Sequence, residues 1–261
     1  MTTPAPSLDR PRIKPPIFFA NWKMNHGPTE ARAYVAAFLQ FFAPHDDRTV
    51  GIFPPALSLA TVREARANRT DILLGVQNIH SQEKGAFTGE NSAPMAIDAG
   101  AQLALVGHSE RRHVFAETNL EAGKKVAFAA RFGLTPVLCV GETLEQRQMG
   151  DAESIVDTQL RVGLSLMPAA SVSSVIIAYE PVWAIGTGHS ATPQDASSMH
   201  RTIRAVLREL SPEGERTTPI VYGGSVNRAN AKSLLDAEGV DGLLVGSACL
   251  DPEGWAEICR T

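Results

Sequence analysis

A carboxylate that follows an apolar run is the first feature of this sequence that suggests chemistry. Glu180 comes directly after the β-prone run 174–179, and Pro181 disfavours the helical region for the residue before it, which keeps Glu180 extended. Gly186 and Gly188 free the far end of the loop that follows. A carboxylate at the root of such a loop predicts a base that acts when a lid excludes water. An ordinary surface glutamate before a strand–helix loop fits the same pattern.

Two more functional side chains follow other apolar runs. Lys23 comes two residues after Asn21, so their side chains point the same way if the chain stays extended. Taken alone, Lys23 fits a surface lysine, and His108 fits a buried histidine with satisfied hydrogen bonds. Together with Glu180 they suit proton transfer next to a carbonyl. In that chemistry Glu180 removes a carbon-bound proton, His108 polarises the carbonyl and Lys23 stabilises the developing negative charge.

Two glycine-rich turns indicate an anion site. The stretch Tyr222-Gly223-Gly224-Ser225 fits a tight turn with Ser225 as the N-cap of a helix, and free backbone N–H groups at a helix start also attract phosphate. Gly246 and Ser247 offer further N–H groups after the last apolar run. These features predict a small phosphorylated hydroxycarbonyl substrate, whose enediolate a closed lid would protect from losing phosphate. We expect no cofactor and no metal.

The elements that must position these groups alternate along the whole chain. Eight apolar runs are typical of strands covered on both faces; they span 17–20, 49–53, 72–76, 103–106, 135–140, 174–179, 219–222 and 242–245. Amphipathic stretches between them predict helices, among them 29–42, 57–68, 120–131, 152–164, 193–210 and 227–237. Eight such units suit one closed (β/α)8 barrel. A doubly wound open sheet is the alternative, but no GxGxxG fingerprint follows the first run.

Composition narrows the class of protein further. The 261 residues carry a net charge of −4 with scattered basic residues, which argues against nucleic acid as a partner. The three cysteines form no CxxC pair, and no apolar run is long enough to span a membrane, so we expect a cytoplasmic protein. The proline-rich segment 1–15 lacks the apolar centre of a signal peptide and predicts a poorly ordered tail. Residues 16–261 are expected to form the barrel.

Six motifs in this sequence resemble the triosephosphate isomerase family. They are NWKMN at 21–25, GAFTGE at 85–90, GHSERR at 107–112, PVLCVGETLEQR at 136–147, AYEPVWAIGTG at 178–188 and YGGSV at 222–226. The resemblance runs from about residue 17 to the C-terminus, with the motifs in family order. It implies a (β/α)8 barrel that interconverts dihydroxyacetone phosphate and D-glyceraldehyde 3-phosphate in glycolysis and gluconeogenesis.

The resemblance also implies a role for each site residue. Glu180 would be the base and His108 a neutral electrophile at a helix start, which are the established roles of these residue types in the family. Asn21 and Lys23 would contact the substrate, and Glu110 would be a charged neighbour. The loop 181–188 would be the lid. The family is usually a homodimer, in which the loop around 77–90 enters the partner near its Asn21 and Lys23. Phosphate would meet the backbone N–H groups of Gly186, Ser225, Gly246 and Ser247.

Two departures from the family pattern leave alternatives open. Ser247 stands where a glycine is common, which is tolerable if its φ is negative and costs about 1–2 kcal/mol if φ is positive. The far hinge of the lid, 189–191, is also unusual. A sister isomerase for a four-carbon ketose phosphate is therefore one alternative, and aldol cleavage through a Lys23 Schiff base is another. A non-catalytic phosphate-binding barrel is disfavoured because Lys23, His108 and Glu180 are all present.

Overall fold

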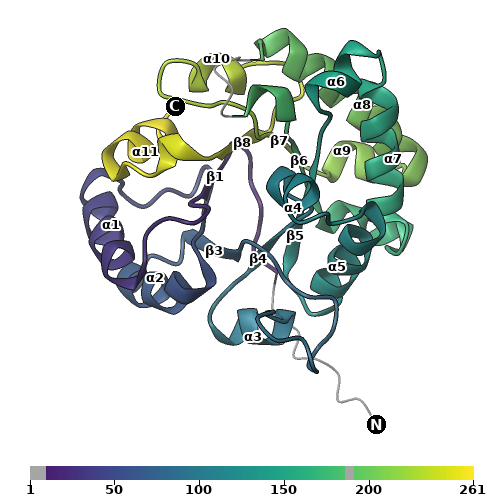
Figure 1. Cartoon of the computed structure of the whole chain (residues 1–261). Coiled ribbons are helices and arrows are strands. Elements are labelled where there is room, and N and C mark those ends of the chain that lie inside the picture. Colours follow the sequence, from purple (N-terminus) through teal and green to yellow (C-terminus); the bar gives the residue numbers. More distant parts are fainter. Residues whose placement is uncertain (1–9, 186–190) are drawn as a thin grey trace.

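The computed structural model describes residues 10–185 and 191–261, and within them eight parallel strands close into a barrel in sequence order (Figure 1). The strands are β1 (Ile17–Asn21), β2 (Thr49–Phe53), β3 (Ile72–Val76), β4 (Leu103–Val106), β5 (Thr135–Val140), β6 (Ile176–Tyr179), β7 (Ile220–Tyr222) and β8 (Gly242–Val245). β1 pairs with both β2 and β8, which closes the ring. The predicted (β/α)8 barrel is therefore confirmed.

Helices surround this ring of strands on the outside (Figure 1). The α-helices are α1 (Pro28–Phe41), α2 (Leu59–Arg66), α3 (Ala93–Asp98), α4 (Ser109–His113), α5 (Asn119–Arg131), α6 (Leu144–Gln148), α7 (Ala152–Leu164), α8 (Pro193–Leu210), α9 (Gly214–Thr217), α10 (Ala231–Leu235) and α11 (Pro252–Cys259). The 3₁₀ turns are η1 (Ala56–Ser58), η2 (Ala169–Ser174), η3 (Val182–Ala184) and η4 (Ser247–Cys249). α4 and α6, each of five residues, are too short to show the periodicity by which longer helices are predicted.

The strands are apolar throughout because each faces two separate cores. In β1, Ile17 and Phe19 point into the barrel and pack with inward residues of other strands, whereas Phe18 and Ala20 belong to the layer under the helices. Successive strand side chains point to opposite faces, so a strand covered on both sides cannot alternate polar and apolar residues. No helix among the described residues is long and apolar enough to cross a membrane.

Two predicted elements near the site begin later in the structure than expected. The run 174–179 starts two residues too early, because η2 occupies residues up to Ser174 and β6 begins at Ile176. The helix expected over 227–237 is shorter, since α10 begins at Ala231 with Asn230 as its N-cap. The side chain of Asn227 accepts hydrogen bonds from the N–H groups of residues 229 and 230 and so forms a turn first. Ser225 is therefore not the cap of this helix.

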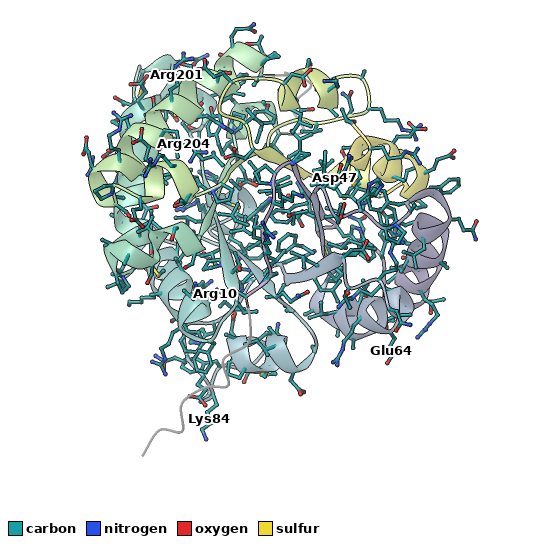
Figure 2. All side chains as sticks on the ribbon, turned by 180° about the vertical axis from the view of Figure 1, so that it is seen from behind. Arg10, Asp47, Glu64, Lys84, Arg201 and Arg204 are labelled. Atoms are coloured by element: carbon teal, nitrogen blue, oxygen red, sulfur yellow. The ribbon has the colours of Figure 1, made fainter. Side chains whose placement is uncertain are left out.

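Residues 10–14 contact the end of the barrel where the strands begin. The Lys14 N–H donates to Thr49 Oγ1 over 2.7 Å, at the start of β2. Arg10, labelled in Figure 2, donates to the carbonyl oxygen of Ala130 over 2.7 Å. Ile13 packs against the inward-facing core. Residues 1–9 of the expected tail lie outside the described part of the chain.

Candidate active site

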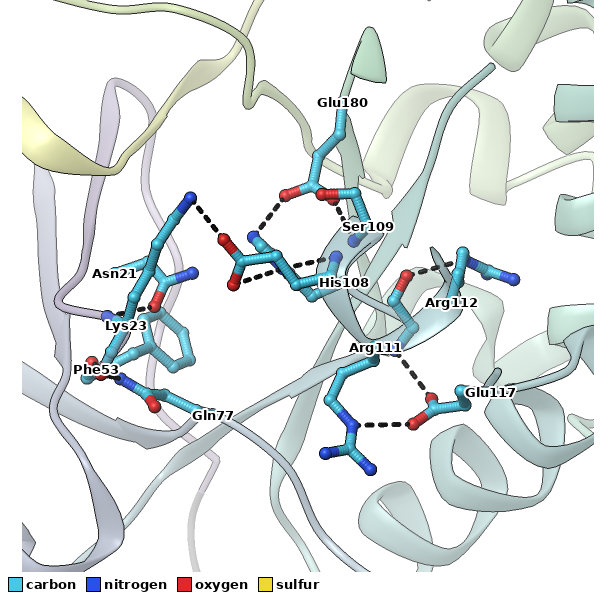
Figure 3. Close-up of polar contacts among 12 residues, drawn as sticks. Asn21, Lys23, Phe53, Gln77, His108, Ser109, Arg111, Arg112, Glu117 and Glu180 are labelled. Atoms are coloured by element: carbon cyan, nitrogen blue, oxygen red, sulfur yellow. Dashed lines mark hydrogen bonds and ion pairs between the residues drawn. The ribbon is translucent and has the colours of Figure 1, made fainter. Parts of the chain in front are cut away.

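The opposite end of the barrel, where the strands finish, contains a cavity of about 270 Å³. Its lining comes from the ends of β1, β4, β6, β7 and β8. The lining includes Asn21, Lys23, His108, Glu180, Gly223, Gly224, Ser225, Gly246 and Ser247. Figure 3 shows Lys23, His108 and Glu180 converging from three different strands. The barrel therefore brings together groups that lie up to 226 residues apart in the sequence, from Asn21 to Ser247.

Glu180 is held in place at the end of β6. Its N–H donates to the carbonyl oxygen of Val140 over 2.7 Å, so the parallel ladder continues one residue past the strand. Gly141 is needed beside it, because a Cβ at that position would lie 1.7 Å from the Glu180 carbonyl oxygen. Glu180 is 2% exposed, and its carboxylate accepts a hydrogen bond from the Ser109 N–H over 2.8 Å.

Glu180 and His108 contact each other directly. Glu180 Oε1 lies 3.0 Å from His108 Nε2. Burial raises the pKa of the Glu180 carboxyl, but the contact with His108 and the Ser109 N–H outweigh burial, and the pKa lies below its usual range. Burial lowers the pKa of His108, but the negative charge of Glu180 outweighs it, so this pKa lies above its usual range. Each group therefore favours the charged form of the other, within one buried contact.

A second contact of His108 favours the uncharged form of its ring, whereas the contact with Glu180 favours the charged form. His108 is the N-cap of α4, and its Nδ1 accepts the Glu110 N–H over 3.3 Å. A ring nitrogen that accepts a backbone N–H cannot also carry a proton, so this bond favours the neutral imidazole with its proton on Nε2. The expected position of His108 at a helix start is thus observed. Its neutrality depends on whether Glu180 remains beside it.

Lys23 adopts an unusual backbone conformation, and two hydrogen bonds hold its backbone groups. Its φ is +51°, in the left-handed region, so the chain does not stay extended after Asn21 as the sequence had suggested. The Lys23 N–H donates to Asn21 Oδ1 over 3.0 Å. Gln77 Nε2 donates to the carbonyl oxygens of Lys23, over 2.8 Å, and Phe53, over 2.9 Å. Lys23 Nζ then reaches the cavity, 2.8 Å from Glu110 Oε1.

The two glycine-rich turns face the same cavity. A Cβ on Gly223 would lie 3.0 Å from Glu180 Cγ, and one on Gly246 would lie 3.4 Å from Lys23 Cε, so both glycines permit close approach of catalytic candidates. Ser247 is not among the described non-glycine residues with positive φ, which removes the strain that a serine would otherwise bear. Gly186 and the hinge residues 189 and 190 lie outside the described residues.

Sequence reasoning missed the group that supports the root of the predicted lid. Glu142 is fully buried after β5 and accepts hydrogen bonds from Tyr179 Oη, over 3.1 Å, and Trp183 Nε1, over 2.8 Å. Arg147 Nη1 lies 3.2 Å from the same carboxylate. The position of Glu142 after a predicted strand was the available signal. Its partners come from other strands and could not be inferred from that position.

Gln77 and Arg112 were also missed. Gln77 holds Lys23, as described above. Arg112 donates to the carbonyl oxygens of Gly107, over 2.7 Å, and Cys139, over 3.0 Å, which ties the turn before α4 to β5. Within residues 10–185 and 191–261, no group of three or more His, Cys, Asp or Glu side chains is arranged to hold a metal ion.

Comparisons with known proteins agree on one family. The family model described as triosephosphate isomerase matches residues 16–261. A triosephosphate isomerase from Aquifex aeolicus is 44% identical over 242 residues, which cover 93% of this chain and 97% of the relative. One from Symbiobacterium thermophilum is 43% identical over 248 residues, covering 95% and 96%. One from Roseiflexus sp. is 44% identical over 247 residues, covering 94% and 97%.

Proposed function

This chain belongs to the triosephosphate isomerase family, and on that premise we propose that it interconverts dihydroxyacetone phosphate and D-glyceraldehyde 3-phosphate through an enediolate. The observation that carries the proposal is the single cavity that Glu180, His108 and Lys23 share with two glycine-rich turns. A base, an electrophile, a cation and a phosphate site then act on one small substrate. The reaction belongs to glycolysis and gluconeogenesis.

Glu180 is proposed as the base. In the described site its carboxylate is bonded to His108 and to the Ser109 N–H, so it must leave both to reach a substrate carbon. These two contacts lower its pKa, whereas burial raises it. A substrate that separates Glu180 from His108 leaves burial as the main influence, and the carboxylate becomes a stronger base. Closure of the loop after Glu180 would strengthen this effect by excluding water.

His108 and Lys23 are proposed to stabilise the negative oxygen of the enediolate. Once Glu180 has moved away, the Glu110 N–H at Nδ1 keeps His108 neutral, and its Nε2–H is free to donate to the substrate oxygen. Lys23 Nζ supplies a positive charge on the same side of the cavity, with Glu110 as its counter-ion. Asn21 is proposed as a further substrate contact. The phosphate group is proposed to accept hydrogen bonds from the backbone N–H groups of Gly186, Ser225, Gly246 and Ser247.

An isomerase assay coupled to reduction of dihydroxyacetone phosphate tests this proposal. Turnover of D-glyceraldehyde 3-phosphate, with a large preference over a four-carbon ketose phosphate, is expected. A preference for the four-carbon substrate would make the chain a sister isomerase, and absence of turnover would favour a phosphate-binding barrel. Borohydride treatment with substrate should leave Lys23 unlabelled, whereas covalent trapping would indicate Schiff-base chemistry.

We also propose that the active enzyme is a homodimer. Exposed apolar side chains lie close to the site, with Met24 95% and Phe115 63% exposed. Both line a second cavity of about 200 Å³ next to Lys23 and His108. The loop 79–91, which carries Phe87, is closed at its base by the His80 N–H, which donates to the carbonyl oxygen of Asn91 over 2.8 Å. We propose that this loop of one subunit fills that cavity in the other.

Sedimentation velocity tests the dimer. The molar mass of the wild type should be twice that of one chain. Phe87→Asp, in the 79–91 loop, should shift the measured mass toward that of the monomer. Leu166→Asp is the matched control, because Leu166 is similarly exposed but follows α7, outside that loop and cavity. A wild-type monomer, or equal effects of the two changes, would contradict the proposed interface.

The state of the cysteines bears on the cellular compartment of the protein. Cys139, Cys249 and Cys259 are free and buried, which suits a reducing compartment, and we propose the cytoplasm. Residues 16–261 are proposed as the single catalytic domain. The segment 1–15 is proposed to take no part in catalysis.

A further inference from the structure

Behind the phosphate-binding turn, a buried tyrosine from α1 contacts the backbone of η4. Tyr34 Oη donates to the carbonyl oxygen of Cys249 over 2.5 Å, and both residues are buried. Cys249 is the last residue of η4, and its N–H donates back to the carbonyl oxygen of Gly246 over 2.9 Å. The Tyr34 hydroxyl therefore contacts the same short turn that carries Gly246 and Ser247, although Tyr34 does not line the cavity.

The side chain of Cys249 extends this connection to β1. Cys249 Sγ lies 3.7 Å from the carbonyl oxygen of Asn21. Burial raises the pKa of the Cys249 thiol well above its usual range, so the thiol stays protonated and can donate to that carbonyl. Asn21 Oδ1 in turn accepts the N–H of Lys23. One series of hydrogen bonds thus joins α1, the phosphate-side turn, the end of β1 and the backbone of Lys23.

Aromatic packing keeps the tyrosine in position for this contact. The ring of Tyr34 packs edge-on against Trp22, with centroids 4.7 Å apart, and against His26 at 5.1 Å. Trp22 is fully buried and lies between Asn21 and Lys23 in the sequence. A rigid phenol has few rotamers to lose, so its hydroxyl can hold a buried carbonyl at little entropic cost.

From this geometry we propose that Tyr34 and Cys249 are positioning residues, which set the distance between the Gly246–Ser247 turn and the backbone of Asn21 and Lys23. The proposal rests on the proposed function, in which that turn binds the phosphate while Lys23 meets the reacting oxygen. Neither residue touches the substrate. If they hold the turn, their loss should weaken phosphate binding more than it slows the chemical step, because the phosphate is the group that the turn contacts.

Inorganic phosphate is the probe that separates this proposal from the proposed function. Its dissociation constant, measured by calorimetry on the full chain, does not require turnover. Tyr34→Phe keeps the ring and removes the hydroxyl, which leaves the Cys249 carbonyl without this donor, and it should raise the phosphate dissociation constant about five- to tenfold. KM for D-glyceraldehyde 3-phosphate should rise by a similar factor, with kcat changed less than threefold.

Cys249 provides a test by rescue. Cys249→Ala removes the donor to Asn21 and should raise the phosphate dissociation constant, whereas Cys249→Ser keeps a donor and should restore it to within twofold of the wild type. Equal behaviour of the alanine and serine variants would contradict a role for the thiol hydrogen bond.

A buried hydroxyl outside the cavity lining serves as the matched control. Thr218 Oγ1 donates to the carbonyl oxygen of Val172 over 3.3 Å, before β7 begins. Thr218→Val should lower the melting temperature without changing phosphate binding. Phosphate dissociation constants within twofold of the wild type in both Tyr34→Phe and Cys249→Ala, or an equal increase in Thr218→Val, would overturn the proposal. A wild type that does not turn over D-glyceraldehyde 3-phosphate would instead overturn the proposed function.

Discussion

His108 Nε2 lies 3.0 Å from Glu180 Oε1, so the proposed electrophile and the proposed base are bonded to each other in the site as described. The contact is buried, and it shifts the pKa values of the two groups in opposite directions. It also occupies the two atoms that are proposed to act on the substrate. In the proposed mechanism, a substrate placed between the two side chains separates this pair.

Shortening the proposed base should reduce the rate strongly. Glu180→Asp retracts the carboxylate by roughly 1 Å, and a misplacement of this size is expected to cost about 10²-fold in kcat, or about 2.7 kcal/mol. Steady-state kinetics in both directions measure the effect. An unchanged kcat would remove Glu180 from the role of base.

Replacing the proposed electrophile should affect kcat more than KM. His108→Gln replaces the imidazole Nε2–H, which is proposed to donate to the substrate oxygen, with a weaker amide donor on a more flexible side chain. The interaction with the substrate oxygen strengthens as negative charge develops, so a weaker donor should matter most in the transition state. We expect a loss of about 10²-fold or more in kcat, within the range of general acid–base contributions. A loss confined to KM would contradict the assignment.

Gln77 should be needed to hold Lys23. Gln77→Leu removes the donors to the carbonyl oxygens of Lys23 and Phe53, and it should destabilise the fold by about 1–3 kcal/mol. With Lys23 less firmly held at φ +51°, kcat/KM should fall by about tenfold or more. Gln40→Leu, at an exposed position of α1, is the matched control and should alter neither quantity. Equal kinetics of the two variants would contradict the role of Gln77.

His200 should make the fold sensitive to mild acid. It is fully buried on α8, its Nδ1 lies 2.8 Å from the Gly239 carbonyl oxygen, and burial lowers its pKa from 6.5 to about 4. Between these values the unfolded chain binds a proton that the folded chain does not. The free energy of unfolding should therefore fall as pH decreases from 6.5 toward 4, by up to about 3 kcal/mol.

Urea unfolding of the wild type and His200→Phe at several pH values measures this contribution. Phe cannot titrate, so the variant should lose less stability than the wild type across that pH range, although it starts from a lower value because the Gly239 carbonyl loses its donor. Identical pH dependence in the two proteins would contradict a buried neutral His200.

The serine at position 247, which departs from the family pattern, should not impair activity. Because Ser247 does not have a positive φ, Ser247→Gly relieves no strain. We expect kcat and KM for D-glyceraldehyde 3-phosphate to stay within about threefold of the wild type. A gain of tenfold or more in kcat/KM would show that the serine side chain impairs phosphate binding.

The sequence by itself determined the repeat of strands and helices and the residues most suited to chemistry. Strands buried on both faces must be apolar throughout, and helices with one buried face must be amphipathic, so the alternation is readable without coordinates. Glu180, His108 and Lys23 were recognisable because each follows an apolar run, and the ends of parallel strands meet at one end of a barrel.

Only the tertiary structure decided how those residues are held. Gln77 donates a hydrogen bond to the carbonyl oxygen of Lys23, whose φ is positive. Tyr179 and Trp183 donate hydrogen bonds to the buried carboxylate of Glu142. The connection from Tyr34 to Cys249 joins opposite ends of the chain. Hydrogen bonds between distant segments exist only once the barrel has closed, because the pattern of each segment specifies which face it buries but not which polar group it will meet there. Local periodicity therefore predicted the barrel, and long-range contacts decided the working geometry of its site.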